Sequence, residues 1–94
     1  MRLEFDRKKS RLNWQRHGVD FVEAQALWEQ SHVVIAAKTI SGETRYALIA
    51  MMYGSCYAAI FTLRNTAVRL ISCHRADIRL ERIYEDQDKK NTDS

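Results

Sequence analysis

Residues 44–74 read TRYALIAMMYGSCYAAIFTLRNTAVRLISCH. Gly54 and Asn65 mark two turns in this stretch, and they separate three runs that are rich in apolar, β-branched and aromatic residues. A fourth run of the same kind lies upstream, before the turn residues Ser41 and Gly42. Because links this short join antiparallel neighbours, the sequence predicts a four-stranded antiparallel meander. Its strands are expected at residues 33–38, 44–53, 57–63 and 68–74.

The segment before the meander predicts a short strand and a first helix. Residues 2–5 alternate polar and apolar side chains, as a strand with one buried face does. Asp6 can cap a helix over residues 7–16, which is rich in good helix formers. Gly18 is suited to end that helix, because glycine readily adopts the left-handed conformation of a helix terminus.

Two further helices are expected. Asp20 and Glu23 have the spacing of a capping box, so a second helix should follow the first at once. A third helix is expected from about residue 76 to residue 84 or 85, after the last strand. The predicted fold class is therefore α+β, with a short N-terminal strand, two helices, the meander and a C-terminal helix.

Length and composition restrict the class of protein. A chain of 94 residues is expected to hold one domain, because two cores would each fall below the size that sustains folding. We assign this domain to residues 1–85 and expect a polar, disordered tail over residues 86–94. No apolar stretch could span a bilayer, so a cytoplasmic protein without a membrane partner is expected. Cys56 and Cys73 lie in apolar runs and are expected to be buried free thiols.

Positive charge is unevenly distributed along the chain. Residues 1–84 contain 13 basic and 8 acidic side chains, whereas residues 85–94 contain 2 basic and 4 acidic ones. No lysine occurs between residues 39 and 88, so the cations of that region are arginines. An arginine donates two parallel hydrogen bonds to a phosphate, which favours a nucleic-acid partner. An acidic protein partner would fit these side chains almost as well.

Five arginines fall within residues 64–82 and are expected to cluster at the sheet and the helix that follows. Arg75, Arg79 and Arg82 have helical spacing and would share one stripe. Arg69 has the same strand parity as Arg75, so we expect both on one face of the sheet. The residues expected to line a single cleft are Arg64, Arg69, Arg75 and Arg79.

Three histidines could transfer protons, because imidazole titrates near neutral pH. His17 precedes the helix-ending glycine, where a cation interacts favourably with the helix dipole. His32 opens a strand without functional companions and is expected at the surface. His74 stands beside Arg75 at the end of the last strand and is the favoured catalytic residue. The sequence shows no phosphate-binding glycine loop, metal-ligand set or nucleophile elbow, so we expect neither a cofactor nor a metal.

Short motifs follow one another over residues 4–85 in a recognisable order. The N-terminal motifs are Phe5-Asp6, Lys9, Asn13, His17-Gly18-Val19, Phe21 and Glu23-Ala24. The later motifs are Glu43-Thr44-Arg45-Tyr46, Thr62, Arg64, Arg69-Leu70-Ile71-Ser72, Arg75-Ala76, Glu81-Arg82 and Tyr84. In this ordered set the chain resembles the BrnT toxins, small proteins of bacterial type II toxin–antitoxin systems. His74 departs from the family pattern, which usually has an arginine there, and it introduces a titrating group.

The resemblance implies a fold and a set of partners. The fold is expected to be RelE-like, and the activity that of a ribonuclease that inhibits translation and growth. The partner implied is a ribbon-helix-helix antitoxin of the BrnA type, and the complex is implied to bind its own promoter DNA through the antitoxin.

The reaction expected is metal-independent cleavage of RNA. A base removes the 2′-hydroxyl proton, that oxygen attacks the adjacent phosphorus, and an acid protonates the leaving 5′ oxygen. The expected catalytic residues are Arg64, His74, Arg75, Arg79 and Glu81. The expected substrate-binding residues are Arg69, Arg45, Tyr46, Lys9 and His17. Two alternatives stay open: a non-catalytic basic module that binds nucleic acid or only an antitoxin, and a toxin of the same fold that acts on another target such as DNA gyrase.

Overall fold

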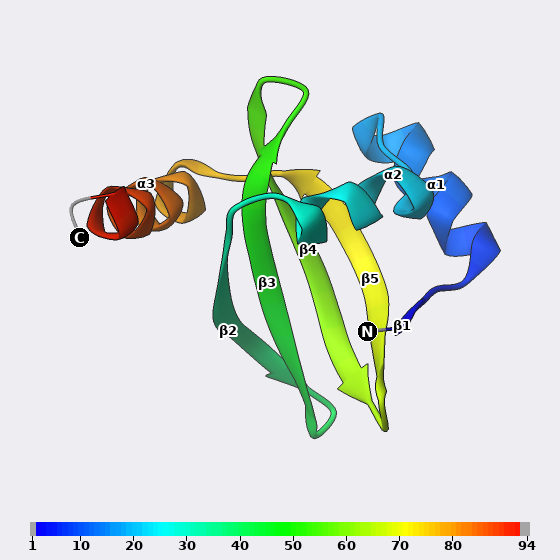
Figure 1. Cartoon of the computed structure of the whole chain (residues 1–94). Helices are drawn as coiled ribbons and strands as arrows, with labels where there is room; N and C mark the ends of the chain where they lie inside the picture. The colour runs from blue at the N-terminus through cyan, green and yellow to red at the C-terminus, as the bar shows by residue number, and fades with distance from the viewer. Residues whose placement is uncertain (1, 93–94) are drawn as a thin grey trace.

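The computed structural model describes residues 2–92, with side chains for residues 2–89 (Figure 1). Five strands form one sheet in the order β1-β5-β4-β3-β2. The elements in chain order are β1 (Arg2–Glu4), α1 (Arg7–His17), α2 (Phe21–Ala24), the 3-10 helix η1 (Gln25–Glu29), β2 (His32–Ile40), β3 (Glu43–Met52), β4 (Ser55–Arg64), β5 (Ala67–Arg75) and α3 (Ile78–Thr92). α1 lies beside β5, and α3 packs against β2 and β3 on the opposite side of the sheet (Figure 1). No helix in the described part of the chain is both long and apolar enough to cross a membrane.

The predicted antiparallel meander is confirmed. β2, β3, β4 and β5 pair in consecutive order, and each begins and ends within two residues of its expected limits. At the first two hairpins, Ser41 and Tyr53 have φ angles of 51° and 53°, and Gly42 and Gly54 follow with 77° and 75°. Two successive positive φ angles give the turn whose twist matches that of the flanking strands. β1 adds a fifth strand that pairs parallel with β5, so the sheet is mixed.

The caps predicted for the first two helices are present. Asp6 accepts hydrogen bonds from two backbone N–H groups of the first turn of α1, at 2.8 and 3.2 Å. Gly18 ends α1 with a φ of 72°. Asp20 and Glu23 form the predicted capping box at the start of α2. After one turn, however, the chain tightens into η1, so the second helix is not the continuous α-helix that we expected.

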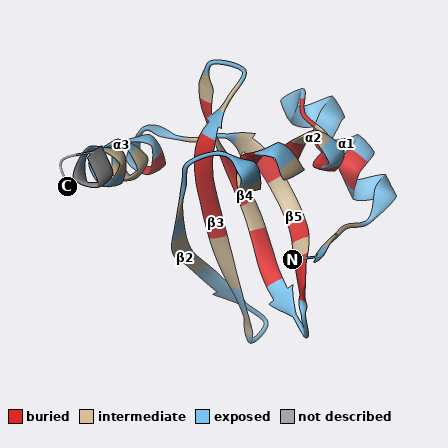
Figure 2. Cartoon of the chain, viewed as in Figure 1, coloured by how far each residue is buried: buried red, intermediate tan, exposed pale blue. Residues whose placement is uncertain are grey.

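Different helices pack on the two faces of the sheet (Figure 2). On one face, α2 and η1 bury the larger core, in which Phe21, Leu27 and Leu48 are fully or almost fully buried. We call this the closed face. On the other face, Leu80 of α3 covers a smaller core that includes Ile49. We call this the open face, because α3 covers part of it, packing against β2, β3 and residues 56–58 of β4.

α3 differs from its prediction at both ends. It begins at Ile78, where the Asp77 carboxylate accepts the backbone N–H of Leu80 at 2.9 Å. Arg75 therefore ends β5, and the predicted stripe of three arginines along the helix is wrong.

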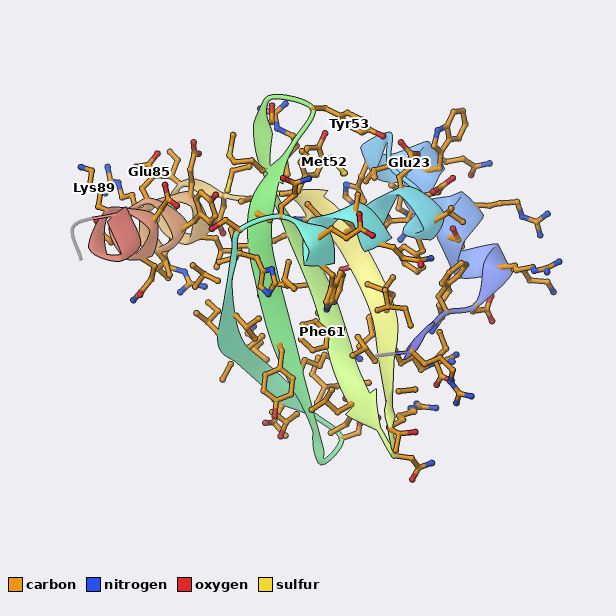
Figure 3. The ribbon with its side chains drawn as sticks, in the orientation of Figure 1. Glu23, Met52, Tyr53, Phe61, Glu85 and Lys89 are labelled. Atoms are coloured by element: carbon orange, nitrogen blue, oxygen red, sulfur yellow. The ribbon has the colours of Figure 1, made fainter. Side chains whose placement is uncertain are left out.

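At its other end α3 runs to Thr92, past the expected end of the helix at residue 84 or 85 and into the segment that we expected to form a tail. Residues 93 and 94 lie outside the described residues. The extension has a physical basis, because Glu85 and Lys89 are four residues apart and lie on the same side of the helix (Figure 3).

Candidate active site

A β-bulge in β5 decides which of its side chains share a face. The residue pairs on the open face are Thr62 with Arg69, Ile60 with Ser72, and Ala58 with His74. Ile71 is the extra residue between the first and second of these pairs. Arg69, Ser72 and His74 therefore share the open face. Our expectation that Arg69 shares a face with Arg75 is wrong, because the bulge reverses the alternation between these two residues.

The same register places His74 against the end of α1. His17 is the last residue of α1, and its ring centroid lies 5.6 Å from that of His74. Nδ1 of His74 lies 3.0 Å from the carbonyl oxygen of Arg75. Because a carbonyl oxygen only accepts, this hydrogen bond puts the proton of a neutral His74 ring on Nδ1 and leaves the Nε2 lone pair free. Two imidazoles thus meet, and one of them presents a basic nitrogen.

A groove between α1 and β5 continues from the two histidines. Its polar lining consists of Lys9, Asn13, Arg16, His17 and Ser72. We call these residues together with His74 the histidine groove. Lys9 and His17, both predicted to bind substrate, are therefore brought together with the predicted catalytic His74.

Next to the groove, a row of polar side chains crosses the open face. Arg45, Thr62 and Arg69 are direct neighbours on β3, β4 and β5, so the two arginines lie about 10 Å apart across the sheet. A guanidinium nitrogen of Arg69 lies 3.7 Å from the Glu4 carboxylate on β1. The Nε of Arg45 is buried and has no hydrogen-bond partner among the described residues. We call these four residues the arginine row.

The charges that act on Asp6 indicate that the histidine groove and the arginine row lie close together. Backbone hydrogen bonds from Lys9 and then Lys8 lower the pKa of the Asp6 carboxyl, and the charges of Lys9 and Arg69 lower it further. Lys9 lines the groove and Arg69 belongs to the row, so both cations lie near one carboxylate. The carboxylates of Asp6 and Glu4 thus lie among the cations of the groove and the row.

Arg64 lies at the end of the open face that is farthest from the histidines, two residues along β4 from Thr62. It pairs with Ala67 at the hairpin end of the sheet, where it lies 3.5 Å from the Glu43 carboxylate. Arg75 stands at the opposite end of β5. With about 3.3 Å per strand residue, the two ends of β5 are about 26 Å apart. The single cleft expected from Arg64, Arg69, Arg75 and Arg79 is therefore wrong.

Four other predicted residues are not among those that line the histidine groove. The Tyr46 ring stacks on Phe61 on the closed face, with 5.5 Å between centroids. Arg75 has the register of the closed face, since it pairs with a residue that packs against the larger core. Arg79 and Glu81 are exposed on α3, which packs against β2 and β3. His32 is exposed on β2, as expected.

Some residues of the groove were assigned no role from the sequence. Asn13 and Arg16 line it from α1, and Ser72 lines it from β5. Helical spacing could have identified Asn13, because Lys9, Asn13 and His17 are successively four residues apart and so lie on one side of a helix. Nothing local could have identified Ser72, because its face depends on the bulge.

Neither thiol takes part in this surface. Both cysteines are buried and free, as predicted. Burial raises the pKa of the Cys73 thiol to about 12, which keeps it protonated and unreactive near neutral pH. In the described part of the chain, no three His, Cys, Asp or Glu side chains are grouped to hold a metal ion.

A comparison with protein families identifies a family for this chain. The family model described as "Ribonuclease toxin, BrnT, of type II toxin-antitoxin system" matches residues 5–79. This span includes α1, the whole sheet after β1 and the first residues of α3, and thus both the histidine groove and most of the arginine row. No curated protein matches the chain. The chain belongs to the BrnT family of ribonuclease toxins of type II toxin–antitoxin systems.

Proposed function

We propose that this toxin cleaves RNA at the histidine groove by metal-independent attack of a 2′-hydroxyl on the adjacent phosphorus. The observation that carries the proposal is the contact between His17 and His74, whose ring centroids are 5.6 Å apart. Two imidazoles at one point can supply both proton transfers of such a cleavage, and each transfer typically accelerates a reaction 10²- to 10⁴-fold.

His74 suits the part of the base, because its Nε2 lone pair is free while Nδ1 donates to the Arg75 carbonyl oxygen. In this assignment Nε2 takes the 2′-hydroxyl proton as the oxygen attacks phosphorus. His17 suits the part of the acid, because its ring, at the end of α1, is the one that meets His74. The bond to the 5′ oxygen breaks as His17 protonates that oxygen. The products are a 2′,3′-cyclic phosphate and a free 5′-hydroxyl.

The cations of the adjoining surface would bind the RNA backbone. Lys9 lines the groove beside the histidines, and Arg69 follows it along β5. A fixed donor at a charge that develops in the transition state can contribute about 3 kcal/mol. Arg45 stands at the far end of the arginine row, on the side away from β1. We propose that Lys9 acts at the scissile phosphate and that Arg69 and Arg45 bind the phosphates next to it.

Cleavage of RNA by the purified toxin in the presence of EDTA tests the proposal. We expect His17→Ala and His74→Ala each to lower kcat about 10²-fold or more, and the parent to release cyclic phosphate ends. His32→Ala is the matched control, because His32 lies exposed on β2, and its rate should equal that of the parent. The site is wrong if both groove variants cleave like the parent. Metal independence is wrong if EDTA stops cleavage and added Mg²⁺ restores it.

The partners proposed for the toxin follow the same family relation. A type II toxin–antitoxin family implies an antitoxin partner and an RNA target. We propose that the antitoxin is a ribbon-helix-helix protein of the BrnA type, that it neutralises the toxin, and that their complex binds its own promoter DNA. We also propose that the α+β fold is of the RelE type. A neighbouring gene for a ribbon-helix-helix protein, and a mobility shift of the promoter by the complex, would support these assignments.

A further inference from the structure

An apolar groove lies on the side of α1 that faces away from β5. Two adjoining depressions, which share Ser10 and Arg11, form it between α1 and the start of α2. We call it the α1–α2 groove and define it by Phe5, Arg7, Arg11, Trp14 and Val22. Trp14 and Val22 are 57% and 63% exposed, which is unusual for side chains of this size and polarity.

The α1–α2 groove is separate from the histidine groove. A helix turns by about 100° per residue, so Arg7, Arg11 and Trp14 lie on one side of α1. Lys9 and Arg16 lie on the opposite side, in the histidine groove. A partner bound in the α1–α2 groove would therefore not cover the two histidines through that contact.

The positive charge of α1 favours an anionic partner. The helix contains five lysine and arginine residues and no acidic residue. Among the described side chains, none of these five cations lies within 4.0 Å of a carboxylate. Arg7 and Lys8 also stand in the first turn, where the helix dipole disfavours positive charge. A helix with this charge violates a local rule of stability, which is typical of residues kept for binding.

The apolar character of the groove distinguishes a protein from RNA. A phosphate backbone offers nothing to Val22 or Phe5, whereas an amphipathic segment can bury apolar side chains there and place acidic ones beside Arg7 and Arg11. An exposed tryptophan next to arginine is also the composition typical of protein-binding hot spots. A second copy of this chain fits poorly, because a symmetric contact would bring the same arginines together.

We infer that the α1–α2 groove is the docking site for an acidic, amphipathic segment of the antitoxin. The inference rests on the antitoxin partner that the family implies. The antitoxin would be held there through Trp14 and Val22 and oriented by Arg7 and Arg11, and it would have to reach the histidine groove with another part of its chain.

Binding of the antitoxin encoded beside this gene, measured by calorimetry, tests the inference. We expect the double variant Trp14→Ser, Val22→Ser to bind it about 30-fold more weakly or worse, as loss of a hot spot does. The control is Leu63→Ser, Ile78→Ser, which removes two apolar side chains of similar exposure, 55% and 68%, elsewhere on the surface. It should bind within about threefold of the parent. Circular dichroism verifies that both variants are folded.

Three outcomes overturn the inference. One is unchanged antitoxin affinity of the groove variant. Another is loss of RNA cleavage by the folded groove variant in the absence of antitoxin, which would assign the groove to RNA. The third is a toxin dimer in sedimentation that the groove substitutions dissociate, which would assign it to a second copy. Antitoxin binding is measured independently of cleavage, so a toxin without ribonuclease activity would refute the proposed reaction and leave this test intact.

Discussion

The Asn13 side chain pairs with the backbone of Cys73 as a neighbouring strand would. Its Oδ1 accepts the Cys73 N–H at 3.1 Å, and its Nδ2 donates to the Cys73 carbonyl oxygen at 2.7 Å. Nδ2 also donates to the carbonyl oxygen of Val19 at 2.8 Å. β1 pairs only with residues 67–69 of β5, so Asn13 satisfies the edge of β5 beyond that point. This contact lies one turn before His17 and one residue before His74, and it holds the two histidines together.

Asn13→Ala is expected to destabilise the protein by about 3 kcal/mol, because three buried backbone groups lose their partners and each costs about 1–3 kcal/mol when unsatisfied. Urea unfolding measures the change. Gln15→Ala, on the exposed side of the same helix, should change the stability by less than about 0.5 kcal/mol. Equal effects of the two substitutions would show that the Asn13 contact contributes nothing specific.

Glu4→Gln is expected to strengthen RNA binding. Glu4 lies 3.7 Å from both Arg69 and Arg2, and its charge competes with a phosphate for those guanidiniums. The glutamine keeps the shape and removes the charge, so the affinity at low salt should rise about threefold, as expected for a partly exposed pair. Fluorescence anisotropy with a 2′-O-methyl oligonucleotide, which cannot be cleaved, measures this affinity. Glu29→Gln on η1 serves as the control, and weaker binding by Glu4→Gln would contradict the prediction.

Arg69→Ala and Arg64→Ala should differ in how much they weaken RNA binding. Loss of one phosphate contact by Arg69→Ala should reduce the slope of log affinity against log salt by about 0.7 for single-stranded RNA. Arg64 is bound to Glu43 at the hairpin end, six residues or about 20 Å along β4 from the partner of His74, so Arg64→Ala should leave affinity within about twofold. The same anisotropy assay compares the two variants. A larger loss for Arg64→Ala would move the RNA path to the hairpin end.

The Cys73 thiol should resist modification in the folded protein. Burial, with a smaller contribution from the Glu23 charge, raises its pKa from 9.0 to about 12. The folded protein therefore keeps a proton that the unfolded chain releases between these values, and raising the pH through this range should lower the stability. At about pH 8 a disulfide reagent should label neither cysteine in the native state and both in guanidinium chloride. Rapid native labelling of Cys73 would show that this part of the core opens.

Local signals account for the elements that could be predicted from the sequence. The Asp6 cap, the Gly18 terminus and the Asp20 capping box each depend on residues at most four positions apart, and all three are present. The meander could also be predicted, because short turns separate its apolar and β-branched runs. The error at the end of α3 arose because residues 86–92 mix good helix formers such as Gln87 and Lys89 with poor ones such as Asp86, so local propensity did not decide where the helix ends.

The candidate site depended on contacts that no local pattern encodes. One extra residue, Ile71, reverses the alternation of β5, so His74 and not Arg75 shares a face with Arg69. A bulge leaves no mark in an apolar run, because either register buries similar side chains there. Likewise, His17 and His74 meet only because Asn13 joins α1 to the edge of β5. The sequence by itself determined the elements, their caps and the family, whereas the tertiary structure decided which charged and titrating side chains form one surface, since strand register and helix docking are set by packing between distant segments.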